Sequence, residues 1–384
     1  MTIMNERVTG SREEYRFDAA KAKRLLAYLG AVRASRRIVL WNRQGIQVMD
    51  RDVSRVFTYS EVAALVDAES LQLDGELLTQ LLKGVKRGQV GRLHDCENGS
   101  LGWIDPDGYL TRLSLPVLSG HPNMWVTRMR EGGSTRVDVP WGHVPALVHS
   151  AGTDDTIPVL THVLVGDGFA CSTDRYRLTI VGEIPWEMTG VQIPSTFLTA
   201  ALKLGADRVG VCVRDGAVLD FEDRANSTLI DDCVVVPLGD GWCASRVGTG
   251  DYPRMHGIVE SCSGDFPVIM TVDPVCSPVD TLKSAAKLAD KETPIHLSRT
   301  GATIRRNGER TTVPWPVIVD RWPVIVDRDD DYVLAVNPTF LREAISAMGD
   351  NVITIRQEIQ GKPLVFTREA GDITIILMPV RVSE

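Results

Sequence analysis

The sequence has little that would direct it to a membrane or out of the cell. No run approaches the roughly 18 to 20 consecutive hydrophobic residues that span a bilayer. The first residues, MTIMNERVTGSREEYR, are polar and charged, which argues against a signal peptide. We therefore expect a cytoplasmic protein with no membrane partner.

The sequence also lacks the patterns of zinc sites and disulfide frameworks. Its 7 cysteines are an odd number, they form no CxxC pair, and no histidine follows one at ligand spacing. Several, such as Cys171 and Cys212, lie within hydrophobic strand patterns and are expected to be buried. The cysteines thus predict a reducing compartment and no metal site.

Nucleotide-binding and nucleophile motifs are missing as well. Gly361-Lys362 is followed by Pro363 and is not a phosphate-binding loop, while Gly248 and Gly250 lead to Pro253, where a dinucleotide motif needs glycine. No serine or cysteine stands in a nucleophile-elbow context. These absences argue against an enzyme and against a cofactor; an enzyme with a scattered site would need an acid, base or metal constellation that the sequence does not show.

An excess of positive charge is absent too. The net charge is −8, with 24% charged and 43% hydrophobic residues, which is ordinary for a globular protein. The total charge does not indicate nucleic-acid binding by bulk charge, although a local basic lining on an acidic body would leave the total unchanged.

What the sequence does contain is an internal repeat. Residues 193–213 and 336–356 share Thr-Phe-Leu, then an alanine and a branched hydrophobic residue at helical spacing, then a turn and a strand. Residues 73–93 have the same layout with two leucines in place of Phe-Leu. The repeat therefore has three copies.

Each copy is preceded by a second segment with a helical start, at residues 17–32, 139–152 and 272–289. Short alternating strands lie between and after the helices. The sequence predicts three α+β units, each with two helices against sheet, with these boundaries: residues 1–132, including a polar N-terminal extension at 1–16, then 133–263 and 264–384.

A tandem heptapeptide, WPVIVDR, occupies residues 315–321 and 322–328. Because seven is odd, a continuous strand would point the second copy to the opposite face, so we predict a bend near residues 321–323. The repeat either lengthens an edge strand or loop or contacts a partner.

The most distinctive stretch is STDRYRLT at residues 172–179, between two hydrophobic strand patterns. By itself it is typical of a solvated hairpin turn. With the repeats and with MPVRV at residues 378–382, however, it resembles the bacterial sliding clamp, the β subunit of DNA polymerase III, whose members carry ATDxxRLA and end in MPMRL. Residues 154–165 and 250–255 support the resemblance, which is weaker in the first unit and rests there on layout and on residues 45–57.

The resemblance implies a head-to-tail homodimer whose six domains form a ring around double-stranded DNA, with helices lining the hole. A basic lining would contact the phosphate groups of DNA and would not distinguish its bases. Contacts of this kind allow the ring to slide along the duplex. The positions that would supply it are Lys21, Arg24, Lys83, Lys86, Arg87, Lys203, Lys283, Lys287 and Lys291. The second unit departs from this pattern, since its helices offer only His143, His149 and Lys203.

The resemblance also implies a pocket between the second and third predicted units, 133–263 and 264–384, that receives short peptide motifs from the DNA polymerase, the clamp loader and repair proteins. Methionine and valine would give an adaptable hydrophobic floor, and arginine and tyrosine would supply hydrogen bonds at the rim. By position, the pocket residues are Leu160, Thr173, Arg175, Tyr176, Arg177, Leu178, Met255, Phe340, Pro363, Met378, Pro379, Val380 and Arg381. Val380 replaces a family methionine, so the preference for partners is expected to differ.

Two functional hypotheses follow from the resemblance. The first is a processivity clamp with no chemistry of its own. The second is a divergent clamp paralogue, cellular or phage-encoded, that keeps the pocket without efficient DNA loading and acts as an adaptor or competitor for clamp-binding proteins. The polar N-terminus, the WPVIVDR repeat and the thin basic lining of the second unit keep the second hypothesis open.

Overall fold

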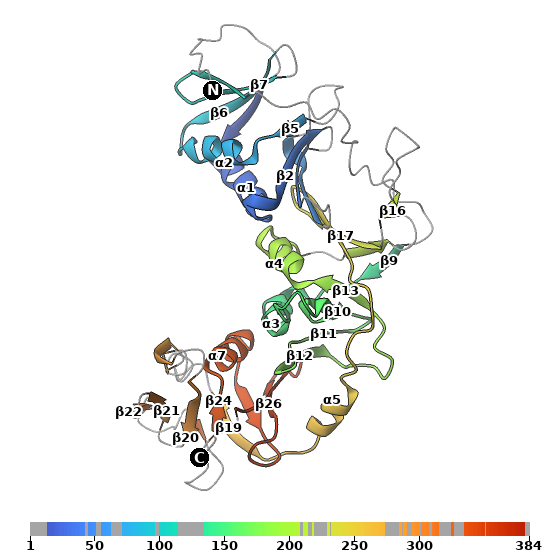
Figure 1. The fold of residues 1–384 in the computed structure, drawn as a ribbon, viewed down its shortest axis with the longest axis vertical. Coiled ribbons are helices and arrows are strands. Elements are labelled where there is room, and N and C mark those ends of the chain that lie inside the picture. Colours follow the sequence, from blue (N-terminus) through green and yellow to red (C-terminus); the bar gives the residue numbers. More distant parts are fainter. Residues whose placement is uncertain are drawn as a thin grey trace. The chain divides into compact units, whose positions relative to one another are not determined.

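The computed structural model describes most of the chain. The described residues are 14–42, 45–50, 55–62, 71–96, 100–113, 134–207, 210–213, 217–218, 229–230, 232–272, 284–285, 287–289, 293–298, 301–306, 309–314, 324–325, 334–349 and 351–380. The chain forms two compact units, one from Met1–Val137 and Phe197–Val247, the other from Asp138–Thr196 and Gly248–Glu384. We call them unit 1 and unit 2; Figure 1 labels their elements. No helix within the described ranges has the length and hydrophobicity needed to cross a membrane.

Unit 1 is built on an antiparallel sheet with the order β5-β2-β3-β4-β18-β17-β14-β9. Its strands are β5 (Leu71–Leu73), β2 (Arg37–Asn42), β3 (Gly45–Asp50), β4 (Arg55–Tyr59), β18 (Gly241–Arg246), β17 (Cys233–Leu238), β14 (Gly210–Val213) and β9 (Ser134–Val137). A second sheet contains β1 (Glu14–Asp18), β6 (Val90–Cys96), β7 (Ser100–Ile104) and β8 (Leu110–Leu113), and a small one contains β15 (Ala217–Val218) and β16 (Leu229–Ile230).

The helices of unit 1 begin where the sequence provides caps. Helix α1 (Ala19–Leu29) starts after Asp18, whose side chain accepts from the backbone N–H of Lys21, and α2 (Gly75–Gly84) starts after Asp74 in the same way. The two helices pack beside each other (Figure 1). The other helical segments are η1 (Ala34–Arg36), η2 (Ser60–Val62) and α4 (Ser195–Lys203), most of which belongs to unit 1.

Unit 2 repeats this plan with a nine-stranded sheet of order β13-β10-β11-β12-β27-β26-β25-β19-β23. Its strands are β13 (Val191–Pro194), β10 (His162–Val165), β11 (Phe169–Thr173), β12 (Arg177–Gly182), β27 (Ile373–Leu377), β26 (Leu364–Arg368), β25 (Ile353–Arg356), β19 (Val268–Val272) and β23 (Val324–Ile325). A four-stranded sheet contains β22 (Glu309–Pro314), β21 (Gly301–Arg306), β20 (Ile295–Ser298) and β24 (Leu334–Val336). The helical segments are η3 (Trp141–His143), α3 (Val144–Ser150), η4 (Pro158–Thr161), α5 (His256–Cys262) and α7 (Pro338–Ala347).

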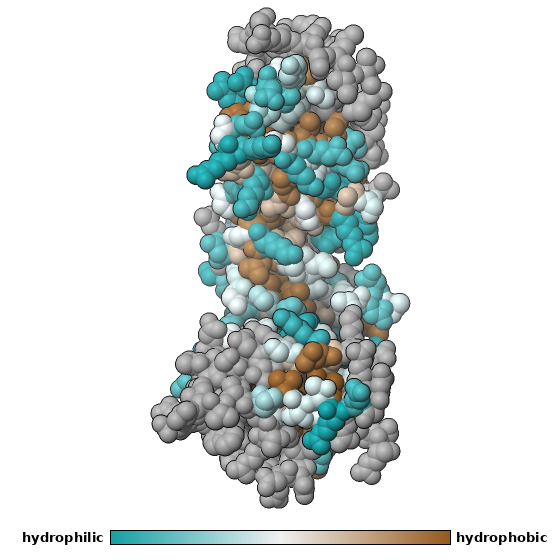
Figure 2. Space-filling model, turned by 90° about the vertical axis from the view of Figure 1, so that its left-hand side faces the viewer, coloured by the Kyte–Doolittle hydropathy of each residue, from teal (hydrophilic) through white to brown (hydrophobic). Residues whose placement is uncertain are grey.

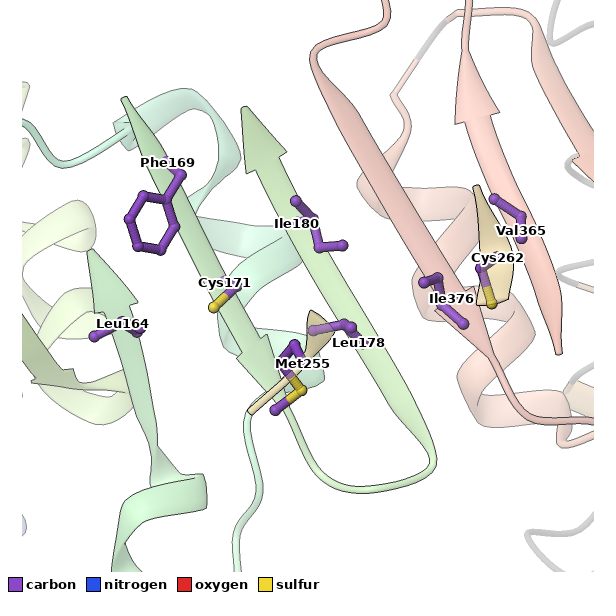
Figure 3. Packing of buried hydrophobic residues seen from close by; sticks show 9 residues of the cluster. All are labelled: Leu164, Phe169, Cys171, Leu178, Ile180, Met255, Cys262, Val365 and Ile376. Carbon is purple, nitrogen blue, oxygen red and sulfur yellow. The ribbon is translucent and has the colours of Figure 1, made fainter. Parts of the chain in front are cut away.

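Helices cover both faces of the unit 2 sheet around β11 and β12. On one face, Ser172 donates to the carbonyl of Leu147 in α3 at 2.6 Å, and Thr179 contacts Ser150. Side chains alternate along a strand, so the neighbours Cys171, Leu178 and Ile180 point to the other face. There they form a hydrophobic cluster with Cys262 of α5 and with Met255, the residue before α5 (Figure 3).

The predicted repeat is confirmed for the helices at 75–84, 195–203 and 338–347. The end of the predicted polar extension was wrong, because residues 14–16 belong to β1, which pairs with β6. In the segment predicted as a helix at 272–289, residues 284–285 and 287–288 are helical. Residue 272 ends β19, residue 289 lies beyond the helix, and 273–283 and 286 lie outside the described residues. The predicted bend at 321–323 also lies outside the described residues.

Candidate functional site

The turn between β11 and β12 is held by its own side chains. The Oδ1 of Asp174 accepts from the backbone N–H groups of Tyr176 at 3.0 Å and Arg177 at 2.9 Å. The hydroxyl of Thr173 accepts from the N–H of Arg175 at 3.1 Å and donates to the carbonyl of Arg177 at 2.7 Å. Aspartate and threonine stabilise tight turns through such bonds, so this part of STDRYRLT fixes its own geometry.

Arg177 ties the turn to helix α7. Its Nε donates to Asp174 Oδ2 at 2.8 Å, and its Nη1 donates to the carboxylate of Glu343. The guanidinium also lies 4.3 Å from the ring centroid of Phe340, and the ring of Tyr176 lies 6.4 Å from the same ring. With its side chain only 12% exposed and two carboxylates beside it, Arg177 positions the turn and has little charge left for a ligand.

The C-terminal strand runs directly beside this turn. Strand β27 pairs with β12 from Arg177↔Leu377 to Val181↔Ile373, and the N–H of Met378 donates to the carbonyl of Tyr176 at 2.8 Å. The segments that carry the two sequence motifs are therefore adjacent in space.

A cavity of about 200 Å³ opens between this turn and helix α5. Its floor is hydrophobic and buried, while Tyr176, Ile258 and Met378 are 60%, 45% and 43% exposed at its rim. It is lined by Leu160, Thr173, Arg175, Tyr176, Arg177, Leu178, Pro253, Arg254, Met255, Ile258, Ile376 and Met378. A hydrophobic floor with adaptable methionines and an exposed aromatic rim suits the hydrophobic side chains of a peptide.

The shape and the lining of the cavity distinguish it from the other hydrophobic places on the surface, which hydropathy alone would not. Figure 2 shows hydrophobic residues reaching one face of the molecule in several separate places, with hydrophilic residues between them. Scattered exposed hydrophobic residues are normal on protein surfaces. The concave shape and the convergence of exposed Tyr176, Ile258 and Met378 distinguish this place.

The structure brings together most of the residues predicted for the pocket. Those that line the cavity are Leu160, Thr173, Arg175, Tyr176, Arg177, Leu178, Met255 and Met378. Phe340 stands behind Arg177 and lines a smaller hollow with His149 and Glu343. Pro363, Pro379 and Val380 are not among the lining residues, and the N–H of Val380 donates to the carbonyl of Ala335 at 3.0 Å. Arg381 lies outside the described residues.

Sequence reasoning missed Pro253, Arg254, Ile258 and Ile376 as lining residues. Ile258 lies three residues after Met255, where the next helical residue on the same face belongs. Ile376 lies two residues before Met378 and opposite Leu178 in the sheet register. Helical and strand spacing could have identified both.

The residues predicted to face DNA have different surroundings. Those that are exposed on or next to helices are Lys83, Lys86, Arg87, Lys203 and Lys287. Lys21 is partly covered, with its amine 3.2 Å from the hydroxyl of Tyr15, whose hydrogen bond raises the pKa of Lys21. Lys283 and Lys291 lie outside the described residues.

Arg24 is engaged by other groups of unit 1. Its guanidinium donates to both carboxylate oxygens of Asp240 and, at 2.6 Å, to the carbonyl of Leu204. The side chain is 31% exposed, and its charge is neutralised by a carboxylate on a distant hairpin. Arg24 is therefore a structural cross-link of unit 1, and its contact with DNA stays a prediction.

No protein-family model matches the chain. The Beta sliding clamp of Streptomyces coelicolor (strain ATCC BAA-471 / A3(2) / M145) is 29% identical to it over 260 residues, which cover 61% of this chain and 62% of that relative. The matched part thus spans less than two thirds of the relative's length.

Solved structures match nearly the whole chain. DNA polymerase III subunit beta from Borrelia burgdorferi, in complex with a natural product, has a TM-score of 0.70 at 14% identity and covers 97% of this chain and 100% of that one. A putative DNA polymerase III beta subunit from Eubacterium rectale ATCC 33656 has a TM-score of 0.68 at 13% identity, with 96% and 100% covered. A sliding clamp from Bartonella birtlesii bound to griselimycin has a TM-score of 0.67 at 14% identity, with 96% and 100% covered. The chain has the fold of these proteins.

Proposed function

We propose that this chain is a DNA sliding clamp, a processivity factor that holds a replicative DNA polymerase on duplex DNA and docks partner proteins through the cavity of unit 2. The observation that carries the proposal is the cavity itself. In a chain with the sliding-clamp fold, the STDRYRLT turn and the C-terminal strand lie side by side and border a hydrophobic hollow with exposed Tyr176, Ile258 and Met378 at its rim. Such a hollow binds peptide side chains without performing chemistry, so we propose that the protein is not an enzyme.

The proposed assembly is a head-to-tail homodimer. The three predicted domains of each chain, at 1–132, 133–263 and 264–384, would complete a six-domain ring around double-stranded DNA. The basic lining would come from Lys21, Arg24, Lys83, Lys86, Arg87, Lys203, Lys283, Lys287 and Lys291. Its contacts would be weak, independent of DNA sequence and sensitive to salt. The partners would be the polymerase and the clamp loader, which would dock through short peptide motifs, and the protein would act in the cytoplasm.

The first test is fluorescence anisotropy with a labelled Gln-Leu-Ser-Leu-Phe peptide. Ile258→Asp places a charge at the rim of the cavity, whereas Ile359→Asp places the same charge at an isoleucine that is 55% exposed and does not line the cavity. Both side chains are exposed, so both variants are expected to fold. We expect saturable binding by the native chain and Ile359→Asp, and at least about tenfold weaker binding by Ile258→Asp, since a charge in a hydrophobic anchor site costs more than about 1.4 kcal/mol.

A chain truncated after Leu377 removes Met378 from the rim and is expected to lose binding as well. Equal binding by the two aspartate variants would place the peptide elsewhere. Absence of binding by the native chain would contradict the proposal that the cavity docks peptides of this type.

A further inference from the structure

Four sulfur-containing side chains lie in or beside the cavity, and they differ in exposure. Met255 and Met378 line the cavity, and Cys171 and Cys262 belong to the hydrophobic cluster that includes Met255 (Figure 3). Met255, Cys171 and Cys262 are buried, whereas Met378 is exposed at the rim. Met378 therefore carries the sulfur of this site that a small solute reaches most easily.

The two cysteines are also protected by their chemistry. A cysteine reacts with oxidants as its thiolate. Burial raises the pKa of Cys171 to about 12 and also raises the pKa of Cys262, so both stay protonated at neutral pH. The thioether sulfur of methionine carries no proton, so its lone pair is available at any pH. Exposure and protonation thus both leave Met378 as the most reactive sulfur of the site.

Met378 also differs from the other methionines that the structure describes. Four of them are buried, namely Met49, Met255, Met270 and Met348. Met188 is half-buried, packs against the hydrophobic cluster and is not among the residues that line the cavity. The most exposed methionine of the described residues is thus the one at the rim of the cavity.

The backbone fixes Met378 at this rim. Its N–H donates to the carbonyl of Tyr176 at 2.8 Å, and the preceding residue, Leu377, pairs with Arg177 in the sheet. A peptide that fills the cavity therefore covers the Met378 side chain, which is part of the lining. Oxidation to the sulfoxide makes this flexible hydrophobic side chain polar. A sulfoxide oxygen covered by a hydrophobic anchor loses water and gains no hydrogen bond, which opposes binding.

We propose that Met378 is a site of reversible oxidation by peroxides, and that the resulting sulfoxide weakens peptide docking in the cavity. The inference rests on the proposed function, since it names a modification that regulates the same site. The sulfur lone pair attacks one oxygen of hydrogen peroxide, and the O–O bond breaks as the S–O bond forms. The proton of the transferred hydroxyl group passes to the departing hydroxide, which leaves as water. The sulfur loses two electrons, and the peroxide gains them.

Docking and oxidation should exclude each other. A peptide in the cavity covers the thioether and slows its oxidation, whereas the thioether of a vacant cavity stays open to peroxide. Peroxide should therefore inactivate vacant cavities first and spare those that already hold a partner. Methionine sulfoxide reductases regenerate the thioether, so the modification is reversible.

The test exposes the native full-length chain to hydrogen peroxide and follows two measurements. Mass spectrometry of proteolytic fragments reports the sulfoxide at each methionine, and fluorescence anisotropy reports the affinity for labelled Gln-Leu-Ser-Leu-Phe. We expect the sulfoxide to form at Met378 before it forms at Met255, and peptide binding to weaken about five- to fiftyfold as Met378 is oxidised. Saturating peptide added before the peroxide should slow the oxidation of Met378. Methionine sulfoxide reductase with a dithiol should restore binding.

Two leucine substitutions provide matched variants. Met378→Leu keeps a hydrophobic side chain of similar volume and removes the thioether, so peroxide should no longer weaken the affinity that this variant has before treatment. Met188→Leu removes a thioether that does not line the cavity, and this variant should be as sensitive to peroxide as the native chain. Because each variant keeps all the other methionines, the difference between the two isolates the effect of Met378.

The outcomes separate this inference from peptide docking itself. If Met378 is oxidised and the native chain keeps its affinity, or if peroxide weakens Met378→Leu as much as the native chain, the inference is wrong and peptide docking stands. Oxidation of Met255 before Met378 would overturn the inference as well. If the untreated native chain binds no peptide, both proposals fall, and that result is seen before any peroxide is added.

Discussion

The two units join distant strands in the same way, and a comparison of the two junctions shows where the cavity comes from. In unit 1, β4 pairs with β18, and in unit 2, β12 pairs with β27. At one end of each junction the backbone carbonyl of an aspartate accepts a hydrogen bond from a backbone N–H. In unit 1 the N–H of Ser60 donates to Asp240 at 2.9 Å, and in unit 2 the N–H of Gly182 donates to Asp372 at 3.3 Å. The repeated plan that the sequence predicts thus extends to individual hydrogen bonds.

At the other end of each junction, an arginine that begins a strand pairs with an aspartate of the preceding turn or strand. Arg55 Nε donates to Asp50 at 2.9 Å, and Arg177 Nε donates to Asp174 at 2.8 Å. In unit 2 the arginine also reaches Glu343 of α7 and borders a cavity. The same kind of ion pair is therefore purely structural in unit 1 and borders a cavity in unit 2, where β27 and α5 leave a hollow beside it.

The largest difference we expect between the junctions concerns the two aspartates that hold the arginines. The Asp50 side chain is 1% exposed and that of Asp174 is 14% exposed. Removing a buried partner leaves an uncompensated charge. Asp50→Ala should therefore lower the free energy of unfolding of unit 1 by about 3 to 5 kcal/mol, and Asp174→Ala should lower that of unit 2 by about 1 to 2 kcal/mol. Hydrogen exchange of the amides in β4 and β12 measures the two effects separately. Equal losses would show that burial does not distinguish the two pairs.

The opposite ends of the junctions offer a second contrast. Asp240 is 14% exposed and holds Arg24 and Tyr28, whereas Asp372 is 40% exposed and holds Arg368 and His143. Burial opposes ionisation of Asp240, but the hydrogen bonds from Arg24 and Tyr28 outweigh it and lower its pKa. Asp240→Ala should therefore destabilise unit 1 by about 2 to 4 kcal/mol, and Asp372→Ala should destabilise unit 2 by less than about 1 kcal/mol.

Tyr28→Phe is the control for that comparison, because it removes one hydrogen bond to Asp240 and keeps the ring. It should cost about 1 kcal/mol, measured by the same exchange experiment on β18. A loss as large as that of Asp240→Ala would assign the stabilisation to the tyrosine and not to the ion pair.

A smaller effect should separate positioning from direct contact at the cavity. Glu343 lies on α7, behind Arg177, and does not line the cavity. Glu343→Gln keeps the shape but removes a charge that orients Arg177, so peptide binding should weaken about two- to fivefold. Arg342→Gln, at an exposed neighbour of Glu343, is the control and should leave binding unchanged. An unaltered affinity in Glu343→Gln would mean that Asp174 alone positions Arg177.

The smallest effect is the pH dependence of unit 2. Burial is the main cause of the lowered pKa of His143 and of His162. An unfolded histidine with the ordinary pKa of 6.5 binds a proton as the pH falls through that value, while the folded one stays neutral to lower pH. Stability should therefore be complete above pH 6.5 and decline below it.

Amide hydrogen exchange of β12, corrected for the pH dependence of the intrinsic exchange rates, measures this effect. The β12 amides are expected to be less protected at pH 5.5 than at pH 7.5. His143→Gln should reduce this dependence, and the unit 1 strand β4 should lack the contribution of both histidines. Greater protection at the lower pH would reverse the sign and contradict the account.

The sequence predicts features that depend on local chemistry. Asp18 caps the helix predicted within residues 17–32, and Asp174 forms the turn that the STDRYRLT pattern indicates. Long-range pairing, by contrast, is not visible in local periodicity. Nothing near Arg24 in the sequence reveals that Asp240 lies against it.

The proposed clamp is tested most directly by its topology on DNA. The protein is incubated with the polymerase and clamp loader of its own source and a nicked circular plasmid, and DNA-bound protein is separated by gel filtration before and after the plasmid is cut once. A ring that encircles the duplex should stay on the circle and slide off when the plasmid is linearised. Retention on both forms would indicate ordinary binding, and failure to load, with peptide binding intact, would favour the adaptor or competitor hypothesis and contradict the account.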